Sequence, residues 1–185
     1  MTAAPDQPRT LSLGEYLTVE SLSDVRHEFL GGHVYAMSGG TVRHDLLAQL
    51  LNAELWNAYL PEGCRTFTHN RKLRVDDCVY YPDVFVTCGT SAHEQYEDDA
   101  VWVVEVASPS TWQIDGREEA LAYLALPSLR GYLLADPEGR TMELRTPHDL
   151  GWSTTVHGPG DVVEMGPARI AVGELYRRLD ELAPR

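Results

Sequence analysis

Two acidic residues in apolar surroundings are the first candidates for chemistry. Asp83 follows Tyr81-Pro82 in a β-like segment, and Glu105 comes 22 residues later, near the end of the apolar run VWVVEV. An unpaired carboxylate inside such a strand is costly, so it must be neutralised, paired or bound to a metal. If the two strands are neighbours, both side chains face one cleft. Their repulsion then raises at least one pKa unless a divalent cation lies between them.

A divalent metal ion suits this pair of carboxylates. Mg²⁺ takes oxygen ligands and keeps several of its waters. One of those waters can become a nucleophile, and the metal can stabilise charge that develops on a phosphate. The spacing leaves simpler interpretations open: Asp83 as a turn or bulge residue after Pro82, and Glu105 as a sheet-end residue paired with an arginine.

The elements that must position these residues alternate between strands and helices. The run 101–106 is the most apolar strand, and the strand–helix–strand order from 101 to 135 predicts a crossover unit with parallel pairing. Pro82 predicts an edge or a bend within its strand. Helices are predicted over 10–18, 41–59, 115–126 and 173–182, a hairpin over 26–37 about Gly31-Gly32, and strands over 64–68, 71–75, 78–87, 101–106, 131–135, 140–146, 152–156 and 161–164.

Composition predicts one globular domain over residues 10–185, after a polar, Pro-rich tail over 1–9. The chain has 185 residues, 43% of them hydrophobic, and a formal net charge of -13. This charge argues against a strongly basic nucleic-acid binder, although it permits a local basic patch. No apolar run is long enough to span a membrane. Cys64, Cys78 and Cys88 lack CxxC spacing, which disfavours zinc and predicts reduced thiols in the cytoplasm.

Several motifs together resemble one protein family. YYPDVFV, VWVVEVASPST, D-x-x-E-E-x-x-x-Y and GYLLADP resemble the Uma family of restriction-endonuclease-like bacterial proteins, as does HEFLGGHVYAMSGGTVRH. The resemblance runs from about Leu13 to Leu182. It implies the PD-(D/E)XK nuclease fold: an α/β (α+β) restriction-endonuclease-like core, with a mixed central sheet flanked by helices and a β-rich C-terminal part. It further implies a homodimer, and Asp83 and Glu105 as ligands of Mg²⁺ or Mn²⁺.

The lysine of the family motif has no counterpart. Ala107 follows Glu105 by two, and Glu119 occupies the helix position to which the family relocates the lysine. Replacing an ammonium by a carboxylate changes the charge by two units, each worth roughly 3 kcal/mol at ~5 Å and an effective dielectric of ~20. Three outcomes are open. Glu119 binds a second metal or acts as a general base, Arg117 supplies the missing charge, or the site is degenerate and Glu119 is solvated.

Further candidates flank the acidic pair. Glu28 matches the family's early glutamate and His44 lies in the first turn of a helix; each is alternatively a surface or capping residue. Residues 65–74 carry four cations and no acid, and Arg71, Lys72 and Arg74 are candidates for phosphate contact. The alternative for them is a solvated outer face, and the acidic loop 94–99 would repel phosphate if it overhung the cleft.

These features predict a divalent-metal-dependent, endonuclease-like phosphodiester hydrolase that acts on nucleic acid, with DNA as the expected partner. Asp83, Glu105, Glu119, Glu28 and His44 are its candidate catalytic residues. The alternative is a catalytically inactive nuclease-fold homodimer that serves as a nucleic-acid or protein interaction module. A third class is a structural homodimer without ligand chemistry.

Overall fold

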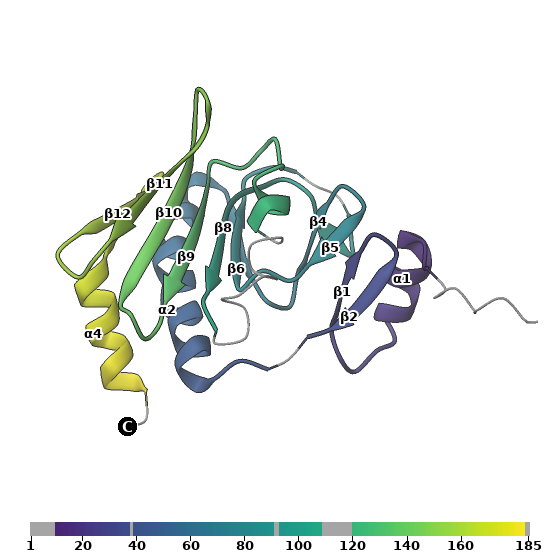
Figure 1. The fold of residues 1–185 in the computed structure, drawn as a ribbon, viewed down its shortest axis with the longest axis horizontal. Coiled ribbons are helices and arrows are strands. Elements are labelled where there is room, and N and C mark those ends of the chain that lie inside the picture. The colour runs from purple at the N-terminus through teal and green to yellow at the C-terminus, as the bar shows by residue number, and fades with distance from the viewer. Residues whose placement is uncertain (1–9, 38, 91–92, 109–119, 184–185) are drawn as a thin grey trace, which may run out of the picture.

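The computed structural model describes residues 10–37, 39–90, 93–108 and 120–183. They form a six-stranded sheet in the order β11-β10-β9-β8-β6-β3, a five-stranded sheet in the order β2-β1-β5-β4-β7, and the hairpin β12-β13 (Figure 1). The elements are α1 (Leu13–Glu20), β1 (His27–Leu30), β2 (His33–Ala36), α2 (Val42–Tyr59), a 3-10 turn (Leu60–Glu62), β3 (Arg65–Thr68), β4 (Lys72–Val75), β5 (Cys78–Tyr80), β6 (Val84–Thr87), β7 (Tyr96–Glu97), β8 (Ala100–Val106), β9 (Gly131–Asp136), β10 (Thr141–His148), β11 (Gly151–His157), β12 (Val162–Met165), β13 (Ala168–Ala171) and α4 (Val172–Leu182).

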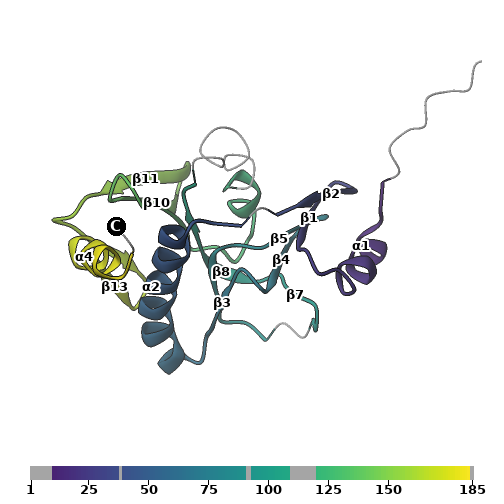
Figure 2. The same cartoon turned by 90° about the horizontal axis from the view of Figure 1, so that it is seen from below.

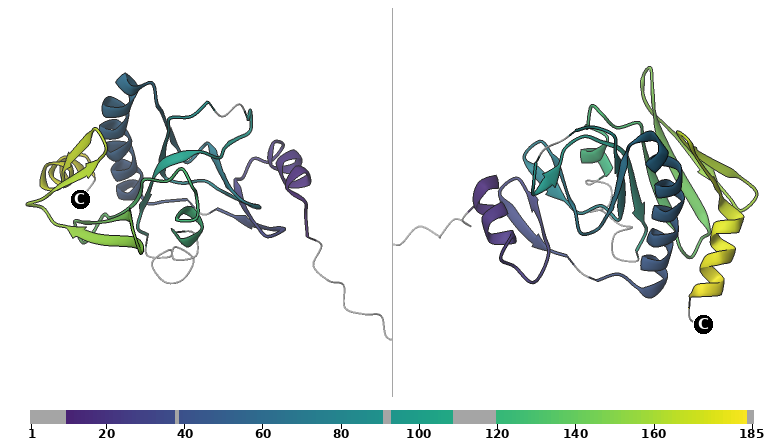
Figure 3. Two further views of the ribbon diagram at one scale, coloured as in Figure 1. Left: turned by 90° about the horizontal axis from the view of Figure 1, so that it is seen from above. Right: turned by 180° about the vertical axis from the view of Figure 1, so that it is seen from behind.

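The six-stranded sheet is packed on both faces (Figure 3). Helices α2 and α4 cover one face through a core that includes Leu51, Leu55 and Leu179. The helical residues 120–123 lie on the other face, where Tyr123 packs with Phe85. This arrangement explains the near-continuous apolar run of β8, because a strand covered on both faces needs apolar side chains in both directions.

The hairpin predicted over 26–37 is confirmed by the pairing of β1 with β2. Gly31 and Gly32 have φ of 56° and 93°, and Leu30 pairs directly with His33 across the turn. Two consecutive residues with positive φ are what a two-residue hairpin turn requires, and glycine adopts them without strain. This hairpin and α1 form the end of the molecule opposite α4 (Figure 2).

The predicted strand over 78–87 is divided between the two large sheets. β5 pairs with β1 and β4, whereas β6 pairs with β3 and β8. The chain crosses from one sheet to the other at residues 81–83, so the bend predicted from Pro82 is confirmed. The parallel pairing predicted for 101–106 and 131–135 is also confirmed, as β8 with β9. The short strand β7 was not predicted, because it lies in an acidic stretch without apolar alternation.

The prediction of three reduced thiols is wrong for two of them. Cys64 and Cys88 form a disulfide with their Cα atoms 4.2 Å apart, and Cys78 is free. The antiparallel register of β3 and β6 pairs Arg65 with Thr87, which brings the two flanking cysteines together. Their separation of 24 residues carries no local signal, so only the strand pairing makes the bond possible.

Within the described ranges, no helix is both long enough and apolar enough to cross a membrane. The predicted tail over 1–9 and the first half of the helix predicted over 115–126 lie outside the described residues.

Candidate active site

Asp83 and Glu105 meet at one end of the β6–β8 ladder. The register pairs Val84 with Val104, so the next residues along the two strands, Asp83 and Glu105, are neighbours. The backbone N–H of Asp83 donates to Glu105 Oε2 at 3.3 Å, and the N–H of Val106 donates to Asp83 Oδ2 at 2.8 Å. The condition for a shared site, that these two strands are adjacent, is therefore met.

His44 approaches the same carboxylate from the start of α2. Its Nε2 lies 3.2 Å from Asp83 Oδ2, and its side chain is only 14% exposed. Thr41 caps the helix by accepting from the N–H of His44, which orders the first turn. The hydrogen bond to Asp83 raises the pKa of His44, against the lowering effect of burial. Gly40 permits this approach, since a Cβ there would lie 2.8 Å from His44 Nδ1.

Glu28, on the five-stranded sheet, is hydrogen-bonded to the segment that carries Asp83. Phe29 pairs with Val79, and both face the α1 side of the sheet, so Glu28 points to the opposite face, the one that holds Tyr80. Burial raises the pKa of Glu28 to about 6, and a hydrogen bond from the backbone of Tyr81 lowers it in part. The residue that donates this hydrogen bond, Tyr81, is two residues before Asp83 in the sequence. Three predicted acids thus come from β1, the β5–β6 crossing and β8.

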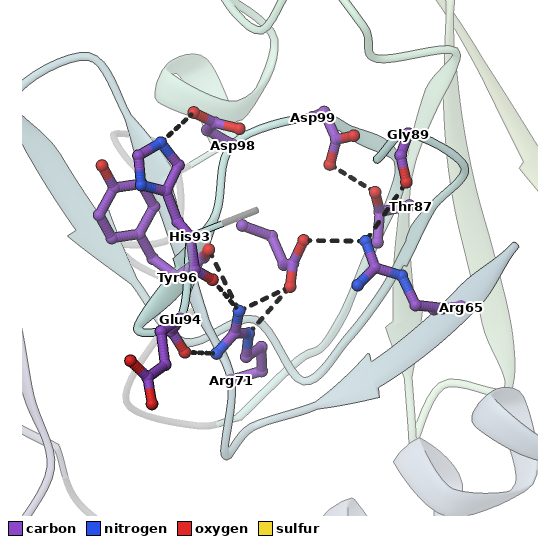
Figure 4. A network of polar contacts seen from close by, with 10 residues as sticks. Arg65, Arg71, Thr87, Gly89, His93, Glu94, Tyr96, Asp98 and Asp99 are labelled. Atoms are coloured by element: carbon purple, nitrogen blue, oxygen red, sulfur yellow. Dashed lines mark hydrogen bonds and ion pairs between the residues drawn. The ribbon is translucent and has the colours of Figure 1, made fainter. Parts of the chain in front are cut away.

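Arg71, one of the candidate phosphate ligands, is held by the protein itself (Figure 4). Its Nε and Nη2 donate to Glu97 Oε1 at 3.0 and 2.7 Å, and Nη2 also donates to the carbonyl of Tyr96. Arg65 donates to the other oxygen of Glu97 at 3.2 Å. Glu97 is 1% exposed, so this arrangement neutralises a buried carboxylate and fixes β7 beside β4. The phosphate role of Arg71 stays a prediction.

Lys72 and Arg74 share one face of β4. Leu73 and Val75 are buried on the other face, as the alternation predicted. The Nζ of Lys72 lies 5.4 Å from the ring centroid of Tyr81, and burial lowers its pKa. Arg74 donates to the hydroxyl of Tyr96 at 3.1 Å.

The side of the sheet separates Lys72 from the acidic residues. Leu73 pairs with Tyr80, so Lys72 is next to Tyr81, whose ring faces α1, whereas Glu28 faces away from α1. The only lysine of the chain therefore lies on the face of this sheet opposite Glu28, on the side where Glu20 contributes to its electrostatic environment. Glu119 and Arg117, the other residues considered for the missing charge, lie outside the described residues.

The donor set fits a hard divalent cation. The described residues contain no group of three or more His, Cys, Asp or Glu side chains arranged to hold a metal. However, Mg²⁺ in proteins is commonly held by one or two carboxylates, with waters and substrate oxygens completing its shell. Asp83 and Glu105 are such a pair, and among the described residues both side-chain contacts of Asp83 fall on Oδ2 alone.

The sequence did not single out Glu20 or the Tyr81 hydroxyl. Tyr81 donates to Glu20 Oε1 at 2.7 Å, and both side chains are buried. A glutamate at the polar end of a short helix carries no pattern that predicts burial. The only sequence signal was the position of Tyr81 immediately before Pro82-Asp83.

Comparisons with known proteins identify the family and the fold of the chain. A family model, Uma2, described as "Putative restriction endonuclease", matches residues 13–169. A protein of Synechocystis sp., "Uncharacterized protein slr1290", is 30% identical over 176 residues, which cover 91% of this chain and 93% of that protein. The crystal structure of a "putative nuclease belonging to DUF820" from Anabaena variabilis superposes with a TM-score of 0.77 and 18% identity, over 91% of this chain and 99% of that one. At this identity the structural match shows the fold.

Proposed function

The chain belongs to the Uma2 family of restriction-endonuclease-like proteins, and from this premise we propose that it is a divalent-metal-dependent phosphodiester hydrolase acting on nucleic acid. The observation that carries the proposal is the joining of Asp83 to Glu105 at the ends of β6 and β8. Two carboxylates held together by the backbone form the minimal ligand pair for Mg²⁺ or Mn²⁺.

Each acidic residue has a proposed part. Asp83 and Glu105 would hold the cation, which would supply Lewis acidity and a water of lowered pKa. Glu28 has a pKa of about 6, so it can take up or release a proton near neutral pH. His44, whose Nε2 lies 3.2 Å from Asp83 Oδ2, would hold that oxygen in place. Glu119 remains a catalytic candidate from the sequence alone.

The partner, the assembly and the location are proposals of the same kind. DNA is the proposed substrate, and a homodimer would place two sites on two strands. A cytoplasmic location was expected from thiols that the sequence predicted to be reduced. The Cys64–Cys88 bond weakens the basis for that expectation, because disulfides persist mainly in oxidising compartments.

Metal binding and cleavage test the proposal together. We expect Mn²⁺ to raise the melting temperature of the wild-type chain, and we expect Asp83→Asn and Glu105→Gln to abolish the shift. Mg²⁺-dependent cleavage of single- or double-stranded DNA is expected to fall by about 100-fold or more in both variants. Glu164→Gln is a matched control, because Glu164 is an exposed acid on the distant β12-β13 hairpin. Absence of both a metal shift and cleavage of any nucleic acid by the wild-type chain would refute the proposal.

A second candidate is a nuclease-fold module that binds nucleic acid without cleaving it. The observation in its favour is the missing motif lysine: Ala107 and Glu119 occupy the two positions for it, and Lys72 lies on the face of its sheet opposite Glu28. This candidate predicts salt-sensitive DNA binding that weakens in Lys72→Ala or Arg74→Ala, with the salt slope reduced by about 1 in each. It fails if no binding is detected at low salt.

A further inference from the structure

Glu20 is a buried carboxylate outside the acidic cluster. It is the last residue of α1, its side chain is 4% exposed, and it makes three contacts. Oε1 accepts from the Tyr81 hydroxyl at 2.7 Å and from the backbone N–H of His27 at 2.9 Å. Oε2 lies 3.0 Å from Nδ1 of His27. Both oxygens are therefore engaged: Oε1 by Tyr81 and the His27 backbone, and Oε2 by the His27 ring.

Both partners of Glu20 are next to residues of the candidate site. His27 directly precedes Glu28 on β1. Tyr81 is two residues before Asp83, and its own backbone N–H donates to the Glu28 carboxylate. One carboxylate thus links the two segments that carry Glu28 and Asp83.

The network extends far enough to orient these segments. The Tyr16 hydroxyl, also on α1, donates to the carbonyl of His27 at 2.6 Å. The Tyr16 and Phe29 rings stack with centroids 4.9 Å apart, so β1 is held against α1 by packing as well as by hydrogen bonds. Burial and the hydrogen bond to Glu20 raise the pKa of Tyr81, so its hydroxyl remains a donor at any ordinary pH.

The fold alone does not require a charge at this position. A buried carboxylate is costly even when it is fully hydrogen-bonded, and apolar side chains of similar size often replace such groups without loss of stability. Residues that orient metal ligands through hydrogen bonds, in contrast, must present donors or acceptors at fixed positions. Glu20 satisfies that second requirement, because its carboxylate accepts from both the Tyr81 hydroxyl and the His27 backbone.

We propose that Glu20 is a positioning residue for the metal site, acting through the Tyr81 hydroxyl and the His27 backbone to hold Glu28 and Asp83 in register. This inference rests on the proposed function, since it assigns Glu20 to the same carboxylate cluster. Glu20 does not itself touch the cation or the reacting atoms.

Calorimetric titration of Mn²⁺ into the full chain, well below its melting temperature, tests the inference. We expect Glu20→Gln and Tyr81→Phe to weaken Mn²⁺ binding by about tenfold each. Glu97→Gln is the matched control, because Glu97 is also a buried glutamate but lies on β7, where it is held by Arg65 and Arg71. It is expected to lower the melting temperature while leaving the Mn²⁺ dissociation constant within about twofold of wild type.

The outcomes separate this inference from the proposed function. Wild-type affinity in both folded variants would overturn the role of Glu20 and leave the metal site standing. Equal weakening in Glu97→Gln would also overturn it, because general destabilisation would then explain the effect. If Glu20→Gln does not fold, Tyr81→Phe decides alone, since it removes only a hydroxyl. No Mn²⁺ binding by the wild-type chain would overturn the proposed function and this inference together.

Discussion

Removal of the Cys64–Cys88 bond is expected to lower the free energy of unfolding by about 3.5 kcal/mol. The two cysteines are 24 residues apart in the sequence. The chain-entropy relation for a closed loop of this size gives about 12 cal/mol/K of entropy lost by the unfolded chain, or about 3.5 kcal/mol at 25 °C. For a chain of this length, that corresponds to a decrease in melting temperature of about 7–14 °C.

The bond joins two strands at the edge of the six-stranded sheet. Cys64 precedes β3, and Cys88 follows β6, whose other end adjoins Asp83. Strand β3 pairs only with β6 among the strands of its sheet, so it depends on this one ladder. Loss of the bond is expected to loosen β3 first, because an edge strand has one hydrogen-bonded neighbour rather than two.

Urea unfolding of the double variant Cys64→Ser/Cys88→Ser measures the effect. Wild-type protein unfolded with reductant should match the double variant, whereas Cys78→Ser should match untreated wild type, because Cys78 is the free cysteine. Thiol titration of the denatured, unreduced chain should find one free thiol. The reasoning is refuted if three thiols titrate, or if the double variant and Cys78→Ser unfold with free energies that agree within about 0.5 kcal/mol.

Two further predictions concern buried carboxylates. Glu97→Gln is expected to cost about 3 kcal/mol in urea unfolding, because it leaves Arg71 without its anionic partner; a cost below about 1 kcal/mol would contradict a net role for this ion pair. Glu28 has a folded-state pKa of about 6, above its usual value, so the folded chain binds this proton more tightly than the unfolded chain. Metal-free wild type should therefore lose up to about 2 kcal/mol relative to Glu28→Gln as the pH rises from about 4.5 to 6.5, and a pH-independent difference would argue against burial as the cause.

Much of the fold was predictable because its signals are local. Gly31-Gly32 predicts a tight hairpin, Thr41 predicts a helix start, and Pro82 predicts a bend, since each acts through the backbone of its own segment. The apolar run 101–106 likewise predicts a central strand, because a strand buried on both faces carries apolar residues at nearly every position. These predictions needed no knowledge of what lies across the sheet.

The engagement of the charged residues was not predictable in the same way. Arg71 was a candidate phosphate ligand because it lies in a basic run, yet its guanidinium donates to Glu97 on a strand that the sequence did not predict. Cys64 and Cys88 pair only because β3 and β6 are antiparallel in one register. A charge or a thiol carries no information about its partner until the chain is folded.

By itself, the sequence determined the type of chemistry: Asp83 and Glu105 in apolar strands, an early glutamate, and a family pattern without its lysine. The tertiary structure decided which groups meet. It joins Asp83 to Glu105, brings His44 to Oδ2 of Asp83, places Lys72 on the sheet face opposite Glu28, and sets Glu20 against the Tyr81 hydroxyl. The physical reason is that residue types and strand periodicity are local properties, whereas register between strands and the crossing from one sheet to the other are set by packing over the whole chain.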